Sequence, residues 1–146
     1  MTANYTLFAM DDGWLTRTAN PTWEDVEDEV MFDSIDLDQS QVDWVFERRS
    51  DALRYLTNGE FGHPGGFAAW DGTGCFMGFI TVPTTAEIAK ILSEKTPEEL
   101  LREATWIEAE FLDDVSRCLR IYYSDLKRFI ENAVLQGNGL ACSFTN

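Results

Sequence analysis

The stretch LDDVSRCLRIYYSDLKRFIENAVLQGNGLACSF, residues 112–144, decides the expected fold. Apolar residues recur three or four positions apart in its first part, which predicts an amphipathic helix from about Leu112 to Gln136. Gly137-Asn138-Gly139 predicts the end of this helix, and the apolar run at 140–144 predicts a closing strand. The buried stripe of the helix is expected to consist of Val115, Leu119, Tyr122, Leu126, Phe129 or Ile130, and Ala133.

Two strands and two shorter helices are predicted upstream of this stretch. YTLFAM at residues 5–10 and CFMGFITV at residues 75–82 are apolar runs typical of strands, and Pro83 ends the second. Capping boxes that begin at Thr84 and Thr96 each predict the start of a helix, because the threonine hydroxyl and a glutamate three positions later satisfy free backbone N–H groups.

Two more helices are predicted in the first half of the chain. One is expected over residues 21–32 with Asn20 as its N-cap. The other is expected over residues 41–57, with Ser40 as its N-cap and with Gly59 in a left-handed conformation after its end.

The order of these elements predicts an α+β fold for residues 1–146, arranged as a single domain. We expect a small mixed or antiparallel sheet packed against several helices, including the long C-terminal helix followed by a final strand. A chain of 146 residues is long enough to bury a hydrophobic core without disulfide or metal cross-links.

The charge balance bounds the class of partner. The chain has 26 acidic and 11 basic residues, a net charge of −15. Such a protein repels polyanions, so we expect no direct binding to nucleic acid and none to anionic membrane surfaces, whereas a basic protein would be attracted. The start of the chain has no signal-peptide pattern, and no apolar run is long enough to cross a membrane. The number of cysteines is odd (Cys75, Cys118 and Cys142), which favours reduced thiols. We therefore expect a cytoplasmic protein.

Several segments resemble the YfbM-like family, small bacterial proteins of unknown function. The segments that carry this resemblance are Ile35–Asp38, Leu53–Gly59, Phe79–Leu92, Asp125–Phe129 with Ala133, and Gly137–Leu140. The resemblance mainly covers residues 35–146 and implies an α+β fold, but it supplies no activity and no catalytic residues. The chain departs from the family pattern before Trp44, where Ser40-Gln41-Val42-Asp43 stands, and its glycine-rich loop is short.

An acidic segment and an aromatic loop are the candidate partner-binding regions. Residues 18–47 contain ten acids and no lysine or arginine, which indicates either a docking face for a basic protein or a solvated surface. The loop 59–74 is rich in glycine, and its aromatic residues either contact a partner or ligand or are tucked into the core. The candidate partner-binding residues are Glu24, Asp25, Glu27, Asp28, Glu29, Asp33, Asp36, Asp38, Asp43, Phe61, Phe67 and Trp70.

Neither a metal site nor a catalytic site is predicted. Asp36-x-Asp38-x-Ser40 followed by Glu47 imitates a calcium-binding loop, but Gln41 occupies the position that needs glycine. His63 is the single histidine, which excludes sites built on several histidines, and no nucleophile motif accompanies it. We therefore expect no catalytic residue, no metal and no cofactor.

The sequence favours a non-enzymatic, acidic cytoplasmic module that binds a basic protein partner. A specific form of this hypothesis is an immunity protein or inhibitor that neutralises a toxin or nuclease. Two alternatives stay open: a small-molecule-binding protein or small enzyme that uses the loop 59–74, and a nucleic-acid mimic that occupies a DNA-binding protein.

Overall fold

The last strand of the chain lies at the centre of the sheet. The computed structural model describes residues 4–11, 33–38, 44–60, 68–69 and 74–145. In that part of the chain, β1 (Asn4–Met10), β2 (Asp33–Asp38), β3 (Ala68–Ala69), β4 (Gly74–Ile80) and β5 (Gly139–Thr145) form one sheet in the order β2-β1-β5-β4-β3. Each neighbouring pair is antiparallel. The predicted sheet is therefore confirmed as antiparallel, and the predicted closing strand holds its two halves together.

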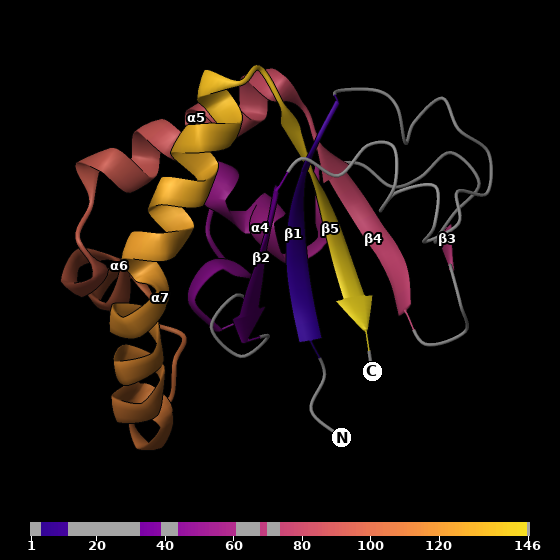
Figure 1. The fold of residues 1–146 in the computed structure, drawn as a ribbon. Helices are drawn as coiled ribbons and strands as arrows, with labels where there is room; N and C mark the ends of the chain where they lie inside the picture. Colours follow the sequence, from indigo (N-terminus) through magenta and orange to yellow (C-terminus); the bar gives the residue numbers. More distant parts are fainter. Residues whose placement is uncertain (1–3, 12–32, 39–43, 61–67, 70–73, 146) are drawn as a thin grey trace.

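Three consecutive helices connect β4 to β5. They are α5 (Val82–Glu94), α6 (Pro97–Glu103) and α7 (Ala109–Leu135). Figure 1 shows them together beside the sheet, with α7 returning the chain to β5. The capping box predicted at Thr96 is confirmed, because its hydroxyl accepts from the N–H of Glu99 and the Glu99 carboxylate accepts from the N–H of Thr96. The α+β fold class is confirmed.

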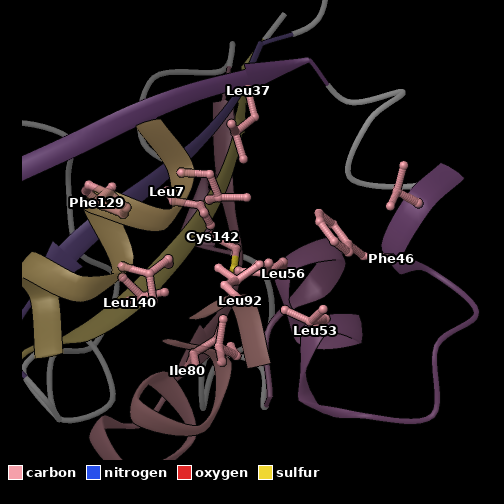
Figure 2. Packing of buried hydrophobic residues seen from close by; sticks show 14 of the residues in the cluster. Leu7, Leu37, Phe46, Leu53, Leu56, Ile80, Leu92, Phe129, Leu140 and Cys142 are labelled. Carbon is pink, nitrogen blue, oxygen red and sulfur yellow. The ribbon is translucent and has the colours of Figure 1, made fainter. Parts of the chain in front are cut away.

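The hydrophobic core lies between one face of the sheet and the helices (Figure 2). Alternate residues of β1, β2 and β5 point into it, as the two-residue period of a strand requires. The core residues with the smallest exposed fraction include Leu7, Leu53, Leu56, Ile80, Ile88, Leu92, Leu100, Leu119, Ile130, Leu140 and Cys142. Residues of the alternate set, such as Phe8 and Phe79, are also buried.

The long helix α7 confirms the prediction with one correction. It runs from Ala109 to Leu135, and all the predicted stripe residues except Tyr122 are buried. Tyr123 takes the core position, because Leu119, Tyr123 and Leu126 follow one another at spacings of four and three. The Tyr123 hydroxyl donates to the carbonyl of Leu92 at 2.6 Å and to that of Lys95, whereas Tyr122 is 37% exposed.

The single helix predicted over 41–57 is wrong. The described part contains a helical turn at 44–46, a break, the 3-10 helix η2 (Ala52–Arg54) and the short helix α4 (Tyr55–Asn58). Asp51 explains the break, because its carboxylate accepts from the N–H of Leu53 at 3.2 Å and begins a new helical segment there. Gly59 follows the last turn with a positive φ of 86°, as predicted, but its ψ of 168° lies outside the left-handed helical region.

The predicted strand 75–82 ends earlier than expected, and the helix after it starts earlier. β4 ends at Ile80, and Thr81 is the N-cap of α5, with its hydroxyl accepting from the N–H of Thr84 at 3.4 Å. The prediction of a helix start at Thr84 is therefore wrong by one turn. The error comes from Pro83, because a proline ends a strand. Proline is also tolerated in the first turn of a helix, because a backbone N–H at that position has no intrahelical partner in any case.

Strand β2 was not predicted as a strand. Its sequence DSIDLD alternates polar residues with Ile35 and Leu37, and that period of two is the signal that was available. Asp36 and Asp38 therefore lie in extended backbone paired with β1, which is incompatible with a calcium-binding loop at 36–47. A second unpredicted strand, β3, lies within the loop 59–74. The helix predicted over 21–32 lies outside the described residues.

No helix in the described ranges is both long and apolar enough to span a membrane.

Candidate functional site

Three of the predicted site residues lie on β2, which is at one end of the strand order. Asp33 and Asp36 are exposed, and Asp36 Oδ1 accepts from the hydroxyl of Thr6, its neighbour across the strand pair, at 2.7 Å. The backbone of Asp38 pairs with Asn4. The other predicted site residues lie outside the described residues: Glu24, Asp25, Glu27, Asp28, Glu29, Asp43, Phe61, Phe67 and Trp70. His63 also lies outside them.

An aromatic groove lies on the surface of the described part of the chain. It has a volume of about 210 Å³ and lies between the helical turn at 44–46 and the connection that leads from α6 into α7. We call it the Trp44 groove. Its lining residues are Trp44, Glu47, Arg48, Trp106, Ile107, Glu108 and Phe111.

Contacts between the aromatic residues hold the two walls of the Trp44 groove together. The indole Nε1 of Trp106 donates to the backbone carbonyl of Trp44 at 2.6 Å. The rings of Trp44 and Phe111 pack edge to face, with centroids 4.8 Å apart and planes at 71°, a geometry that aromatic pairs favour. Trp44 is nevertheless 36% exposed and Phe111 39% exposed, so both rings offer apolar surface to a partner.

The charged residues of the Trp44 groove are two acids and one base. Glu47, Arg48 and Glu108 are all exposed at its rim. A cationic side chain of a partner would meet aromatic faces and two carboxylates, while Arg48 can donate to a carbonyl or carboxylate oxygen.

Ion pairs made by Arg49 fix the segment that carries Trp44. Arg49 has a side chain only 7% exposed, and its guanidinium contacts the Asp51 carboxylate at 2.6 Å and the Glu103 carboxylate at 3.0 Å. Lys95 also contacts Glu103, at 2.7 Å. The segment after Trp44 is therefore tied to α6, the helix that leads to Trp106.

These contacts shift the pKa values of the groups involved. The pKa of Arg49 is raised, first by its hydrogen bonds with Asp51. Burial tends to raise the pKa of Asp51, but the hydrogen bonds and charge of Arg49 outweigh burial and hold that pKa below its ordinary value of 3.8. The pKa of Glu103 is lowered from 4.5, first by its hydrogen bond with Lys95. All three groups are charged at neutral pH.

A pH dependence of stability follows from the lowered pKa of Asp51. A carboxyl whose pKa is lower in the folded state stabilises the fold above its unfolded pKa, and this stabilisation is lost as the pH falls through the folded pKa. We expect the free energy of unfolding to fall as the pH drops below the ordinary value of 3.8. Asp51→Asn should lower the free energy of unfolding at neutral pH and flatten this part of the profile. Urea unfolding from pH 6 to pH 3 measures both, and parallel profiles for the two proteins would contradict the assignment.

The fold can now be compared with known structures. Superposition on the crystal structure of YfbM from Escherichia coli, a protein of unknown function, gives a TM-score of 0.61 over 99% of this chain and 100% of that chain. The fold is that of YfbM. The resemblance seen in the sequence is thereby confirmed at the level of the fold, and at 14% identity the likeness to YfbM shows the fold alone.

Sequence comparisons add no assignment to this match. No protein-family model matches the chain, and no curated protein matches it in sequence. YfbM is itself described as a protein of unknown function, so the likeness carries no activity to this chain.

The other polar clusters have structural roles. The Glu60 carboxylate accepts from the N–H and hydroxyl of Thr81 at 3.0 and 2.8 Å and from the hydroxyl of Thr84 at 2.6 Å, which fixes the start of α5. Burial tends to raise the pKa of Glu60, but these hydrogen bonds outweigh it and keep the carboxylate charged. Burial raises the pKa of the Cys142 thiol to about 12, so this thiol is no nucleophile at neutral pH. Within the described ranges no cluster of His, Cys, Asp and Glu could hold a metal ion.

The Trp44 groove was missed at the level of sequence. Its two walls lie about 60 positions apart in the chain, and the contacts of Arg49 with Glu103 and of Trp106 with Trp44 bring them together. A faint signal was present in TWIEAEF at residues 105–111, where aromatic residues stand between two predicted helices. The sequence marked Trp44 only by the departure from the YfbM-like pattern in the residues before it.

Proposed function

We propose that this chain is a protein-binding module that takes a basic protein partner at the Trp44 groove. The observation that supports this most is the pair of half-exposed rings, Trp44 and Phe111, with the carboxylates of Glu47 and Glu108 at the same rim. Tryptophan is enriched among the residues that dominate binding energy at protein interfaces.

The chemistry of the groove selects a lysine or arginine side chain from the partner. A cation over an aromatic face contributes about 0.5–2 kcal/mol, depending on how far it is desolvated. The carboxylates of Glu47 and Glu108 would add charge-assisted hydrogen bonds. The net charge of −15 attracts a basic protein over longer range and raises its rate of association.

The volume of the groove favours a side chain over a free ligand. Sites for small molecules usually have about 300–1,000 Å³, whereas the Trp44 groove has about 210 Å³. The small-molecule alternative raised by the sequence relies on the loop 59–74, of which only 59–60, 68–69 and 74 are described.

The biological role that follows from this proposal is inhibition of a basic enzyme. A toxin or nuclease concentrates lysine and arginine around its active site, because its substrate is a polyanion. An acidic module that inserts its groove there would exclude that substrate, as an immunity protein does. In this proposal the base-free segment Glu24–Asp43 provides further attraction, and Asp33 and Asp36 are its exposed members on β2.

A capture experiment with matched baits tests the proposal. Wild-type protein, Glu108→Lys, Phe111→Ala and Asp33→Lys are immobilised, and bound proteins from a native cell lysate are identified by mass spectrometry at low and at moderate salt. We expect one basic partner on the wild type, with an affinity at least ten-fold weaker for Glu108→Lys and Phe111→Ala, about 1.4 kcal/mol or more. Asp33→Lys changes the net charge by the same amount as Glu108→Lys but leaves the groove intact. The loss of partner affinity caused by Asp33→Lys should therefore be smaller, and it should diminish as the salt concentration rises.

Two outcomes would contradict this proposal. The absence of a partner at both salt concentrations would contradict binding of a basic protein. An equal loss of affinity for Glu108→Lys and Asp33→Lys, with no loss for Phe111→Ala, would show that only overall charge matters. Thermal unfolding of each bait confirms that the substituted proteins are folded.

A further inference from the structure

The outward face of α7 carries a regular row of charges around one exposed apolar residue. Asp114, Arg117, Ile121, Asp125 and Arg128 follow at spacings of three, four, four and three, so they share one face of the helix. All five are exposed, and Ile121 is 62% exposed. The buried residues of α7, such as Leu119, Tyr123 and Ile130, lie on the opposite side.

The charges in this row reverse sign about Ile121. Arg117 lies four positions before it and Asp125 four positions after it; Asp114 lies seven before and Arg128 seven after. Consider a second α7 packed antiparallel to the first, with the two Ile121 side chains facing each other. A residue a given number of positions before Ile121 in one helix then lies opposite the residue the same number of positions after Ile121 in the other helix. Arg117 is then level with Asp125 of the copy, and Asp114 with its Arg128. A parallel pair would instead place like charges level with each other.

We propose that α7 forms a self-complementary interface, through which two copies of this chain associate about a two-fold axis at Ile121. A surface with this pattern suits a two-fold dimer, because each contact occurs twice and no second kind of surface is needed. Each half of the interface holds two acids and two bases, with the two copies of Ile121 in contact between the halves.

The ion pairs within one helix leave these charges available. Asp114 and Arg117 are 3.8 Å apart, and Asp125 and Arg128 are 4.0 Å apart. The four side chains are 63–77% exposed, and such pairs contribute little in water. Turning these side chains toward a second copy therefore costs little and gains pairs that are less exposed to solvent.

The local charge of α7 explains why this face, rather than another, suits a second copy. The chain carries −15, so most of its surface repels a copy of itself. Residues 113–128 contain three acids (Asp113, Asp114, Asp125) and four of the 11 bases (Arg117, Arg120, Lys127, Arg128), and are therefore nearly neutral. A shallow hollow of about 470 Å³, lined by Asp113, Ser116, Arg117, Arg120 and Ile121, lies along the same helix.

Analytical ultracentrifugation with paired charge reversals tests the interface. The wild type should approach twice the 16.6 kDa of one chain as its concentration rises. Asp125→Arg puts arginine level with Arg117 and should weaken the dimer at least ten-fold. Arg117→Asp combined with Asp125→Arg exchanges the two charges and should restore it. Asp33→Arg, the same change on β2, should leave the dimer unchanged. A wild type that stays monomeric, or a dimer that Asp125→Arg does not weaken, would overturn the proposal.

Disulfide trapping tests the orientation of the two helices. In a Cys118→Ser background, Ile121→Cys should form a cross-linked dimer under mild oxidation, because position 121 meets itself at the two-fold axis. Leu135→Cys should not cross-link, although Leu135 is more exposed than Ile121, at 83% against 62%. Two copies of position 135 would be separated by 28 helical positions, about 42 Å at 1.5 Å per residue. Equal trapping at both positions would contradict the antiparallel arrangement.

Discussion

Gly59→Ala is expected to lower the free energy of unfolding by about 2–6 kcal/mol, which is large for a change of one methyl group. Gly59 has a φ of 86° and a ψ of 168°, a region that almost only glycine adopts and that costs an L-residue roughly 1–3 kcal/mol. A Cβ at this position would also lie 2.7 Å from the backbone carbon of Gly78 and 2.7 Å from the nitrogen of Phe79. Forcing extra atoms into a packed region adds roughly 1–3 kcal/mol.

The neighbouring hydrogen bonds explain why the backbone at Gly59 cannot shift to make room for a Cβ atom. The N–H of Gly59 donates to the carbonyl of Tyr55 at 2.6 Å, and the N–H of Glu60 donates to the carbonyl of Phe79 at 2.8 Å. The backbone is therefore tied to α4 before the Cα atom of Gly59 and to β4 after it. Moving it away would break the contact that brings Glu60 to the start of α5.

Gly137→Ala is the matched control for this prediction. Gly137 also has a positive φ, 71°, but no atom lies within 4 Å of the Cβ position. It should therefore show only the conformational penalty, about 1–2 kcal/mol. Urea unfolding of both variants measures the difference, and equal losses would mean that the close approach of Gly59 to β4 is not as the structure describes.

Phe46→Ala is expected to lower the free energy of unfolding by about 3–5 kcal/mol. Phe46 is 1% exposed and lies in the core beside Leu53 and Leu56 (Figure 2). Removing its ring leaves a cavity that the surrounding side chains fill only in part, so the loss of buried apolar surface and the cavity both contribute.

Phe111→Ala is the control for Phe46→Ala, because it removes the same ring from a half-exposed position. Phe111 is 39% exposed and its ring packs on Trp44 at the surface. We expect a loss of about 1 kcal/mol, roughly the extra contribution of an aromatic pair. Chemical unfolding followed by far-ultraviolet circular dichroism measures both variants. A similar loss for the two would show that Phe111 is part of the core, and Phe111→Ala would then be unsuitable for testing the Trp44 groove.

Elements specified by local chemistry were predicted well. The stripe of α7 appears at the expected positions, except that Tyr123 replaces Tyr122, because an amphipathic helix has to bury one face. The Thr96 capping box forms because its partners lie only three residues apart. Two of the errors arose where two local signals compete. Pro83 suits either the end of a strand or the first turn of a helix, and Asp51 ends one helical pattern by capping the next.

The candidate site was predicted less well than the fold. The acidic residues were counted correctly, but a count does not show which of them face the same way, and only Asp33 and Asp36 can now be placed as exposed side chains on β2. The Trp44 groove needs Arg49 to reach Glu103 and Trp106 to reach Trp44, contacts between residues 54 and 62 positions apart. No local pattern specifies such contacts.

The sequence by itself determined the α+β class, the long helix with its closing strand and the charge of −15. Only the tertiary structure decided that the closing strand lies at the centre of the sheet, that Tyr123 rather than Tyr122 is buried, and that Trp44, Trp106 and Phe111 meet. The physical reason is the separation along the chain of the residues that interact. Periodicity, capping and net charge depend on neighbours along the chain or on totals, whereas strand order and grooves depend on packing between segments that the chain brings together only when it folds.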